Sequence, residues 1–392
     1  MNAGAQISVS TRKALIVGAG IGGLSAALAL RSAGWSVRVF EQAESPRELG
    51  FGVGIAPNAV AALRELGVGD TVVARGFEPR RGELRRMDGS VLKRAELPPN
   101  ALGGPMLVAL RPALHGALLE AVGPETITLG ARVDGFSAIG GAVALSVNGS
   151  SVQGDLLVGA DGVRSIIRQQ LHPDQPPPRH SGIVAVRGAV HGALQHLGDL
   201  HAVYYLGPGV ESMFVRASDT GIYWFLSLAK RIAPPGIEDP AAVVRSMAPK
   251  FDDTFRAITS ATEDMRYDEL VDRDPLRWWG SGVVTLLGDA AHPLLPHTGQ
   301  GAAQAIVDAV TLGNAVRNGT NLEASLRAYE RERIPKTATL LAQGRRTARV
   351  MATTNPVACY LRELLARAIP MTAVARIFVQ INRRAGTDIR SE

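Results

Sequence analysis

The sequence predicts an α/β protein that combines a parallel sheet flanked by helices with a second, antiparallel sheet and then ends in helices. Three observations support this class. An apolar run at residues 14–17 leads through a glycine-rich turn into a helical pattern. Two further short apolar runs, at 156–160 and 283–287, are suited to buried parallel strands. Between residues 179 and 272, apolar and polar side chains alternate in short runs, as they do in antiparallel strands.

Composition narrows the functional classes. The chain has 392 residues, 46% of them hydrophobic and 20% charged, which is typical of a folded globular protein. Cys359 is the only cysteine, so a disulfide framework and a cysteine-based metal site are excluded, and we expect a cytoplasmic location and no metal. The net charge of +6 comes from scattered arginines, which favours anionic small molecules over nucleic acid. No apolar run approaches the roughly 18 residues of a membrane span.

The opening unit predicts a dinucleotide site. The strand at 14–17 is followed by a turn with glycines at positions 18, 20, 22 and 23, and then by a helix. Gly18 permits the tight turn, Gly20 lets a pyrophosphate approach the backbone, and Gly23 lets helix and strand pack closely. The N-terminus of the helix offers free N–H groups and a positive dipole end to the phosphates.

A carboxylate narrows the identity of this dinucleotide. Glu41 ends the second predicted strand, residues 37–40, and stands 18 residues after Gly23. A carboxylate at this place accepts hydrogen bonds from ribose hydroxyls. Its charge would repel a 2′-phosphate, so the dinucleotide is FAD or NAD rather than NADP.

Two later strand ends carry motifs that a nicotinamide dehydrogenase would not need. The strand at 156–160 runs into an Asp-Gly pair, and the strand at 283–287 runs into a Gly-Asp pair. A proline-containing loop after the second pair leads to a Gly-Gln-Gly that opens a helix. These motifs comprise Asp161, Gly162, Arg164, Gly288, Asp289, Gly299, Gln300, Gly301 and Ala302. No second glycine fingerprint follows a strand, so a separate NAD(P)H-binding Rossmann domain is not expected.

The three motifs, in this order, resemble those of the single-component flavoprotein aromatic hydroxylases of the para-hydroxybenzoate or salicylate hydroxylase type. The resemblance covers about residues 13–350. It implies a discontinuous FAD-binding domain of Rossmann-like fold, residues 1–175 and 273–350, a substrate-binding β-sheet domain, 176–272, and a C-terminal helical segment, 351–392. A proline-rich stretch at 173–178 supports the first boundary.

The same resemblance implies the activity. It predicts a monooxygenase that hydroxylates a small aromatic or heteroaromatic substrate through a flavin C4a-hydroperoxide. NADH or NADPH would be a transient electron donor and O2 a co-substrate. We expect a monomer or a homodimer. The substrate itself is not identified by the sequence.

The resemblance also implies the FAD contacts. Asp289 would hold a ribityl hydroxyl, unless it caps the next turn, and Asp161 and Arg164 would meet the pyrophosphate. The helix opened by Gly299 would face the flavin edge where negative charge collects on reduction. Arg111 stands where the family has a flavin-contacting arginine. The predicted contacts are Gly18, Gly20, Ile21, Gly22, Gly23, Glu41, Gln42, Gly54, Arg111, Asp161, Gly162, Arg164, Gly288, Asp289, Gly299, Gln300, Gly301 and Ala302.

The substrate pocket is predicted between the antiparallel sheet and the flavin. Arg187 would face the flavin or the substrate, and Val186 beside it replaces a tryptophan of the family, which leaves the shape of the pocket roof open. His297 is a candidate for substrate deprotonation or a loop cap, whereas His292 would hold its loop by hydrogen bonding. The candidate catalytic residues are Arg187, His297 and Pro293. The candidate walls, which have core packing as their alternative role, are Tyr205, Met213, Phe214, Phe225, Leu294 and Pro296.

Other functions remain open at this stage. FAD could instead support epoxidation, antibiotic modification, halogenation or N-hydroxylation, although the tryptophans at 278 and 279 do not match the W-x-W-x-I-P motif of halogenases. A non-catalytic flavin-binding sensor is the alternative from another class. The C-terminal segment has an amphipathic helical pattern, in which Tyr360, Leu361, Leu364 and Leu365 form a core-like set, and Pro370 interrupts it.

Overall fold

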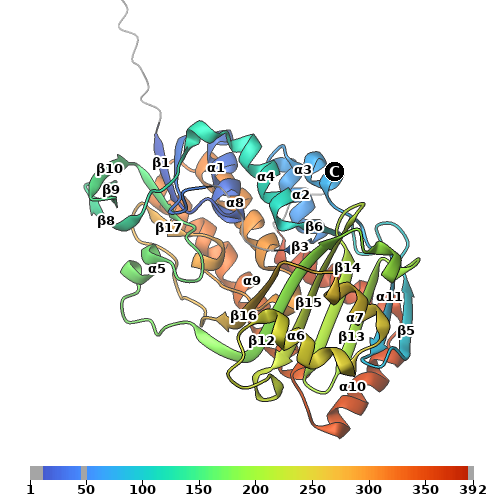
Figure 1. Cartoon of the computed structure of the whole chain (residues 1–392). Helices are drawn as coiled ribbons and strands as arrows, with labels where there is room; N and C mark the ends of the chain where they lie inside the picture. Colours follow the sequence, from blue (N-terminus) through green and yellow to red (C-terminus); the bar gives the residue numbers. More distant parts are fainter. Residues whose placement is uncertain (1–11, 46–50, 387–392) are drawn as a thin grey trace, which may run out of the picture.

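A five-stranded parallel sheet forms the first half of the molecule, in the order β17-β11-β1-β2-β7 (Figure 1). The structure, a computed structural model, describes residues 12–45 and 51–386. The strands are β1 (Lys13–Val17), β2 (Ser36–Phe40), β7 (Ile127–Thr128), β11 (Leu156–Gly159) and β17 (Val284–Leu286). The parallel sheet predicted from the apolar runs is therefore confirmed.

The two faces of this sheet have different covers. Successive residues of β1 point to opposite faces: Ile16 lies beside Gly23, whereas Leu15 lies beside Gly154. Helices pack on the first face and an antiparallel meander on the second. The helices are α1 (Ile21–Ser32), α4 (Arg111–Val122) and α8 (Gly301–Asn318), with α2 (Pro57–Glu65) and α3 (Gly69–Arg75) beyond them. The meander is β8 (Val133–Ile139), β9 (Ala142–Val147) and β10 (Ser150–Gly154).

A seven-stranded sheet, which we call the substrate sheet, forms the second half in the order β16-β12-β15-β14-β13-β4-β5. Its strands are β4 (Arg81–Arg86), β5 (Val91–Glu96), β12 (Arg179–His191), β13 (Ala202–Gly207), β14 (Val210–Arg216), β15 (Gly221–Ala229) and β16 (Met265–Asp272). The expected antiparallel pairs form. Strands β4 and β5 come from the segment that the sequence assigned to the FAD domain, and β4 pairs parallel with β13. Their arginine-rich sequence hides the apolar pattern by which a strand is recognised.

The substrate sheet also has two distinct faces. One is covered by α6 (Pro240–Met247) and α7 (Asp253–Ser260) and contains the second hydrophobic core. The other is turned toward the parallel-sheet half. There the ring of Tyr223 lies against Gly52, in the two-stranded ribbon of β3 (Gly52–Ile55) and β6 (Leu107–Leu110). This second face is the one that can line a site between the halves.

The part of the chain that the structure describes closes with three helices, α9 (Leu322–Met351), α10 (Pro356–Ala368) and α11 (Met371–Ala385). Helix α5 (Ile166–Leu171) lies earlier, between β11 and β12. Pro370 separates α10 from α11, as expected. The expected core-like set of α10 is wrong, because Tyr360, Leu361, Leu364 and Leu365 are 64, 50, 49 and 59% exposed. The helix turns Cys359 and Arg362 toward the protein instead.

Candidate active site

Four neighbouring strands of the parallel sheet end at one edge, and each is followed by a predicted site residue. In spatial order, β17 leads to Asp289, β11 to Asp161, β1 to Gly18 and β2 to Glu41. β1 lies at the point where the chain order of the strands reverses, between β2 and β11. Crevices at such switch points are where open α/β sheets bind ligands.

The three fingerprint glycines have the surroundings that their predicted roles require. Gly18 has φ +100°, and a side-chain carbon on it would lie 2.5 Å from the Ala160 carbonyl oxygen. A carbon on Gly23 would lie only 1.9 Å from the Gly18 oxygen. Gly20 differs from both, because no atom lies within 4 Å of the position that a side chain would take. The backbone at Gly20 is therefore open to a ligand.

Close packing also brings the three motifs together. A side-chain carbon on Gly22 would lie 2.9 Å from Leu287 and 3.3 Å from Ala305 of α8. A side-chain carbon on Gly288 would lie 3.0 Å from the same Ala305. One on Gly54 would lie 3.9 Å from the Gly299 oxygen, so β3 reaches the loop before α8. Loops far apart in the sequence thus form one cradle.

The Glu41 carboxylate ties this cradle together. One of its oxygens accepts a hydrogen bond from the Ala19 N–H at 2.9 Å, and the other accepts one from the Ala43 N–H at 2.9 Å. Gln42 beside it is exposed. Glu41 therefore fixes the glycine loop against the end of β2.

Only one of the two carboxylate oxygens of Asp161 is hydrogen-bonded by the protein. Its Oδ2 accepts hydrogen bonds from the N–H groups of Ile166 and Ile167, at 2.7 and 3.3 Å, and so caps α5. Its Oδ1 is buried and has no hydrogen-bond partner. Burial raises the pKa of this carboxyl. Arg164, three residues further on in the same loop, is exposed. The free Oδ1 is a place for a ligand donor.

Asp289 is surrounded by protein atoms, yet solvent can reach its side chain. It lies deep among protein atoms, and this burial raises its pKa, while His292 and Arg111 act in the opposite direction. Its side chain is nevertheless open to solvent. A carboxyl group in such a place is suited to accept hydrogen bonds from the hydroxyls of a bound ligand, which would favour its charged form.

The start of α8 presents backbone donors. Gly299 has φ +63°, which turns the chain into the helix, and the first helical bond runs from the Gln304 N–H to the Gln300 carbonyl. The N–H groups of 301–303 therefore have no acceptor within the helix. The Gln300 side chain is buried between Asn382 and Gln304, so only the backbone of this residue is available to a cofactor.

The register of the substrate sheet lines up a row of side chains across four strands. Arg187 pairs with Phe225, Phe225 with Met213, and Met213 with Tyr204. Partners in register share a face, and these four lie on the face opposite the α6 and α7 core. Arg187 also lies 3.5 Å from the carboxylate of Asp268, which offsets part of its charge and pairs with Arg266 at 2.8 Å as well.

His297 joins this row through a buried carboxylate. Its Nε2 lies 3.1 Å from Oε1 of Glu211, and both side chains are almost fully buried. The Tyr204 hydroxyl donates to the other oxygen of Glu211, and burial together with this carboxylate raises the pKa of Tyr204 well above its usual value. Both ring nitrogens of His297 are buried without a hydrogen bond, so the contact of Nε2 with Glu211 is ionic only, and Nδ1 has neither kind of contact within the described residues.

Three sequence-predicted positions do not lie on the pocket-facing side. Tyr205 and Phe214 pack edge-to-face with Phe255 of α7, in the core on the far side of the sheet. Val186 lies in the same core, so its replacement of a tryptophan does not shape the pocket roof. In the loop before α8, Pro293 is buried, Leu294 is half-buried and Pro296 is exposed.

Comparisons with known proteins agree with this geometry. A family model described as an FAD binding domain matches residues 11–343. Aurachin C monooxygenase/isomerase from Stigmatella aurantiaca is 35% identical over 362 residues, which are 90% of this chain and 93% of the relative. 3-Hydroxybenzoate 6-hydroxylase from Polaromonas naphthalenivorans is 31% identical, over 86% of this chain and 87% of the relative.

The chain belongs to the single-component FAD-dependent aromatic hydroxylases. Among solved structures, Klebsiella pneumoniae HpxO complexed with FAD and uric acid matches with a TM-score of 0.89 at 26% identity, and the match covers 95% of this hydroxylase and 97% of that chain. The expected fold class, the dependence on FAD and the monooxygenase class are confirmed.

Sequence reasoning missed the residues that hold the hydroxylase's cradle in place. Arg168 is 1% exposed and donates to the carbonyls of Ala290 and Ala291, at 2.9 and 2.8 Å. Burial and the charge of Arg273 lower its pKa to about 9. Its position, one helical turn after Arg164 in the Asp-Gly motif, was the only signal in the sequence.

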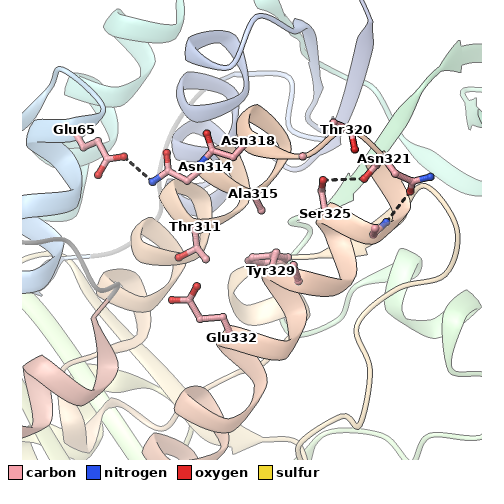
Figure 2. Close-up of a pocket in the computed structure, with 13 residues that line it drawn as sticks. Glu65, Thr311, Asn314, Ala315, Asn318, Thr320, Asn321, Ser325, Tyr329 and Glu332 are labelled. Atoms are coloured by element: carbon pink, nitrogen blue, oxygen red, sulfur yellow. Dashed lines mark hydrogen bonds between the residues drawn. The ribbon is translucent and has the colours of Figure 1, made fainter.

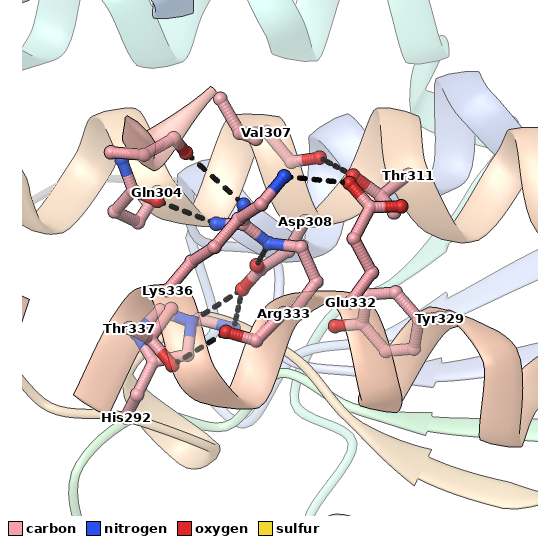
Figure 3. A network of polar contacts seen from close by, with 12 residues as sticks. His292, Gln304, Val307, Asp308, Thr311, Tyr329, Glu332, Arg333, Lys336 and Thr337 are labelled. Carbon is pink, nitrogen blue, oxygen red and sulfur yellow. Dashed lines mark hydrogen bonds and ion pairs between the residues drawn. The ribbon is translucent and has the colours of Figure 1, made fainter. Parts of the chain in front are cut away.

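A buried ionic network forms the second support (Figure 3). Asp308 of α8 accepts from Arg333 Nε of α9 at 2.6 Å, lies 2.5 Å from His292 Nε2, and accepts from the Gly288 N–H at 3.0 Å. Burial would raise the pKa of Asp308, but His292 and Arg333 outweigh it and lower this pKa to about 2. His292 therefore holds its loop by hydrogen bonding, as the sequence suggested.

A pocket of about 780 Å³ between α8 and α9 is separate from this site (Figure 2). It is lined by Thr311, Asn314, Asn318 and Tyr329, among others, and by none of the predicted site residues. The lining residues that belong to α8 lie at least ten residues beyond the start of that helix, about 15 Å along its axis. The pocket does not contribute to the cradle of the hydroxylase.

Proposed function

We propose that the cradle at the switch point binds FAD and that a small, electron-rich aromatic or heteroaromatic ring is hydroxylated between the cradle and the row Arg187–Phe225–Met213–Tyr204. The observation that carries this proposal is the meeting of three distant motifs beside one face of the substrate sheet. The proposed donors and acceptors match the chemistry of FAD, which presents phosphates, hydroxyls and a flat ring.

The fit to FAD rests first on open space beside the backbone of four glycines. A side-chain carbon built on Gly20, Gly162, Gly299 or Gly301 would have no atom within 4 Å. Free N–H groups at the starts of α1 and α8 suit phosphate and the flavin edge. In this assignment Glu41 meets ribose, Asp289 meets a ribityl hydroxyl, and Asp161 and Arg164 lie beside the pyrophosphate.

FAD, when bound and reduced by NADH or NADPH, would activate O2, and O2 supplies the oxygen atom that is transferred. The residues of this chain orient the ring, exclude water and manage a proton. Phe225 and Met213 would contact the ring face. Arg187 lies 3.5 Å from Asp268, which also pairs with Arg266 at 2.8 Å, so the positive charge of Arg187 is only partly offset and can hold a polar ring substituent. We place the enzyme in the cytoplasm, because its single buried cysteine needs no oxidising compartment.

The direct test is product formation. Purified protein loaded with FAD should oxidise NADH or NADPH faster when a matching phenol, quinolone, pyridine or purine is present. The product should gain one oxygen atom, and labelled O2 should supply it. Cofactor oxidation that is never accompanied by an oxygenated product, across the whole panel, would contradict the proposal and indicate another flavin activity.

We propose that His297 accepts the proton of a substrate hydroxyl, with Glu211 and Tyr204 behind it. Its buried, unpartnered Nδ1 supports this role. His297→Asn should lower kcat/KM about a hundredfold for a hydroxylated substrate, which is within the usual range for general bases. The control is His196→Asn, because His196 is exposed on the substrate-sheet half. Equal kcat/KM and an unshifted pH profile in His297→Asn would leave this histidine a structural role only.

Glu41→Ala should raise the dissociation constant of FAD about tenfold, because it removes acceptors for ribose and for the Ala19 N–H. Titration of the stripped protein with FAD, followed by flavin fluorescence, measures the effect. Glu44→Ala is the matched control, since this carboxylate is exposed three residues further on. If both variants bind FAD like the parent chain, Glu41 does not contact the cofactor.

A further inference from the structure

The exposed apolar side chains of this protein are concentrated in one region. Of the fourteen large apolar residues that are exposed in the described ranges, nine lie between 350 and 377. They are Val350, Val357, Tyr360, Leu361, Leu364, Leu365, Ile369, Val374 and Ile377. Single exposed apolar residues need no explanation, but a continuous group of this size marks an interaction surface.

Helix α10 carries most of this group. It exposes its apolar side to solvent and turns its polar side toward the protein. Its exposed residues at 357, 360, 361, 364 and 365 follow the spacing of one helical face, which we call the docking face. Its opposite side contacts the protein through polar groups. Figure 1 shows α10 at the lower edge of the molecule, beyond the substrate sheet.

Polar contacts fix this orientation. Arg362 is 9% exposed and donates to the carbonyls of Gly207 and Met351, at 2.8 and 3.2 Å. Glu363 accepts from Arg86 Nε of β4 at 2.8 Å. Turning the apolar side inward would break both anchors and leave a guanidinium and a carboxylate to find new partners. The contacts of Arg362 and Glu363 therefore hold the docking face toward solvent.

The rim of this region is basic. Between residues 343 and 386 the exposed charged side chains are all arginines: Arg346, Arg349, Arg367, Arg376, Arg383 and Arg384. The single acidic residue in this interval is Glu363, which pairs with Arg86. An apolar helical face with an arginine rim has the composition of helices that lie in the interface of an anionic bilayer.

We propose that α10, together with the start of α11, docks the enzyme on the surface of an anionic membrane. The apolar face would enter the boundary between headgroups and acyl chains, and the arginines would contact lipid phosphates. The helices would lie on the bilayer rather than cross it. In the described part of the chain no single helix is long and apolar enough to span, and α10 and α11 qualify only as a pair that is bent by 96°.

The same charges argue against a second copy of this chain as the occupant. A twofold interface places the same patch on both subunits, so the arginine rims would face each other. Apolar lining also continues past Pro370 into a groove of about 500 Å³ between α11 and residues 96–101, where Met371, Ala375 and Val379 meet Leu97 and Pro98. Arg376 and Arg383 stand at this groove, together with one acidic residue, Glu96. This continuity of apolar and cationic surface suits lipid.

The test is sedimentation of the FAD-loaded, full-length protein with vesicles. We expect binding to vesicles of phosphatidylcholine mixed with phosphatidylglycerol, weaker binding to phosphatidylcholine alone, and loss of the difference at high salt. Leu361→Ser combined with Leu365→Ser should lower the partition coefficient at least tenfold. Arg367→Gln combined with Arg376→Gln should lower it about fivefold per arginine, on the anionic vesicles only.

The control is Leu129→Ser combined with Ile237→Ser, because these two exposed residues lie outside the docking face. It should bind vesicles like the parent chain, and all variants should retain FAD. Light scattering after size exclusion decides the alternative. A dimer that dissociates in the Leu361→Ser, Leu365→Ser variant, without vesicle binding by the parent chain, would overturn the proposal in favour of self-association. Absence of both binding and dimerisation would overturn it as well.

Discussion

Arg333→Met should lower the free energy of unfolding by about 3–5 kcal/mol, because it leaves the buried carboxylate of Asp308 without its guanidinium partner. Both side chains have no exposed surface. Arg333 also donates to the Ala385 carbonyl at 3.1 Å and to Gln304, so the loss reaches α11 and α8. Urea unfolding followed by tryptophan fluorescence measures the change.

Arg331→Met is the matched control, since Arg331 is exposed on the same helix two residues earlier. It should change the free energy of unfolding by less than about 0.5 kcal/mol. Equal effects of the two substitutions would show that the network does not carry the stability of this region. FAD retention should fall in Arg333→Met alone, because Asp308 also accepts from the Gly288 N–H of the cradle.

The same network predicts an acid dependence. Because the pKa of Asp308 is about 2 in the folded chain and near 3.9 in an unfolded one, its pairing stabilises the fold fully above about pH 4. This stabilisation is lost as the pH falls toward 2. Asp308→Asn should therefore have a shallower fall of unfolding free energy over that interval than the parent chain. Parallel curves would mean that Asp308 is not held in its charged form by His292 and Arg333.

The cradle could be predicted from sequence because its signals are local. The run at 14–17, the glycines after it and the Asp-Gly and Gly-Asp pairs each sit at a strand end, and a parallel sheet brings such ends to one edge. No contact across the chain had to be known. Gln300 shows the limit of this reasoning, because its side chain turns into the protein toward Asn382, 82 residues away in the sequence.

The pocket face could not be assigned in the same way. The run at 202–206 has apolar or aromatic side chains at every position, so alternation does not tell whether Tyr204 or Tyr205 faces the site. The structure resolves this by register, with Tyr205 against Phe255 and Tyr204 opposite Met213. The support by Arg168, Asp308 and Arg333 was hidden for another reason: each acts through partners on distant elements, which no sequence spacing encodes.

Gly20→Val should abolish tight binding of FAD while leaving the fold intact. Gly20 has φ −73° and ψ −177°, which a valine adopts readily, and its side-chain position is open. The two methyl groups would occupy the space through which the pyrophosphate approaches the backbone. We expect the dissociation constant of FAD to rise at least about a hundredfold, or about 2.7 kcal/mol. Calorimetric titration measures it, and the unfolding midpoint of the FAD-free protein should not move.

Substitutions at two other glycines serve as controls for the Gly20→Val prediction. Gly23→Ala should lower the yield of folded protein whether or not FAD is present, because its new carbon would lie 1.9 Å from the Gly18 oxygen. Gly116→Ala in α4 should affect neither folding nor FAD, since the nearest atom is 3.7 Å away. If Gly20→Val binds FAD like the parent chain, the pyrophosphate does not pass over this turn. Loss of folding in Gly20→Val would instead show that the open space belongs to the protein rather than to the cofactor.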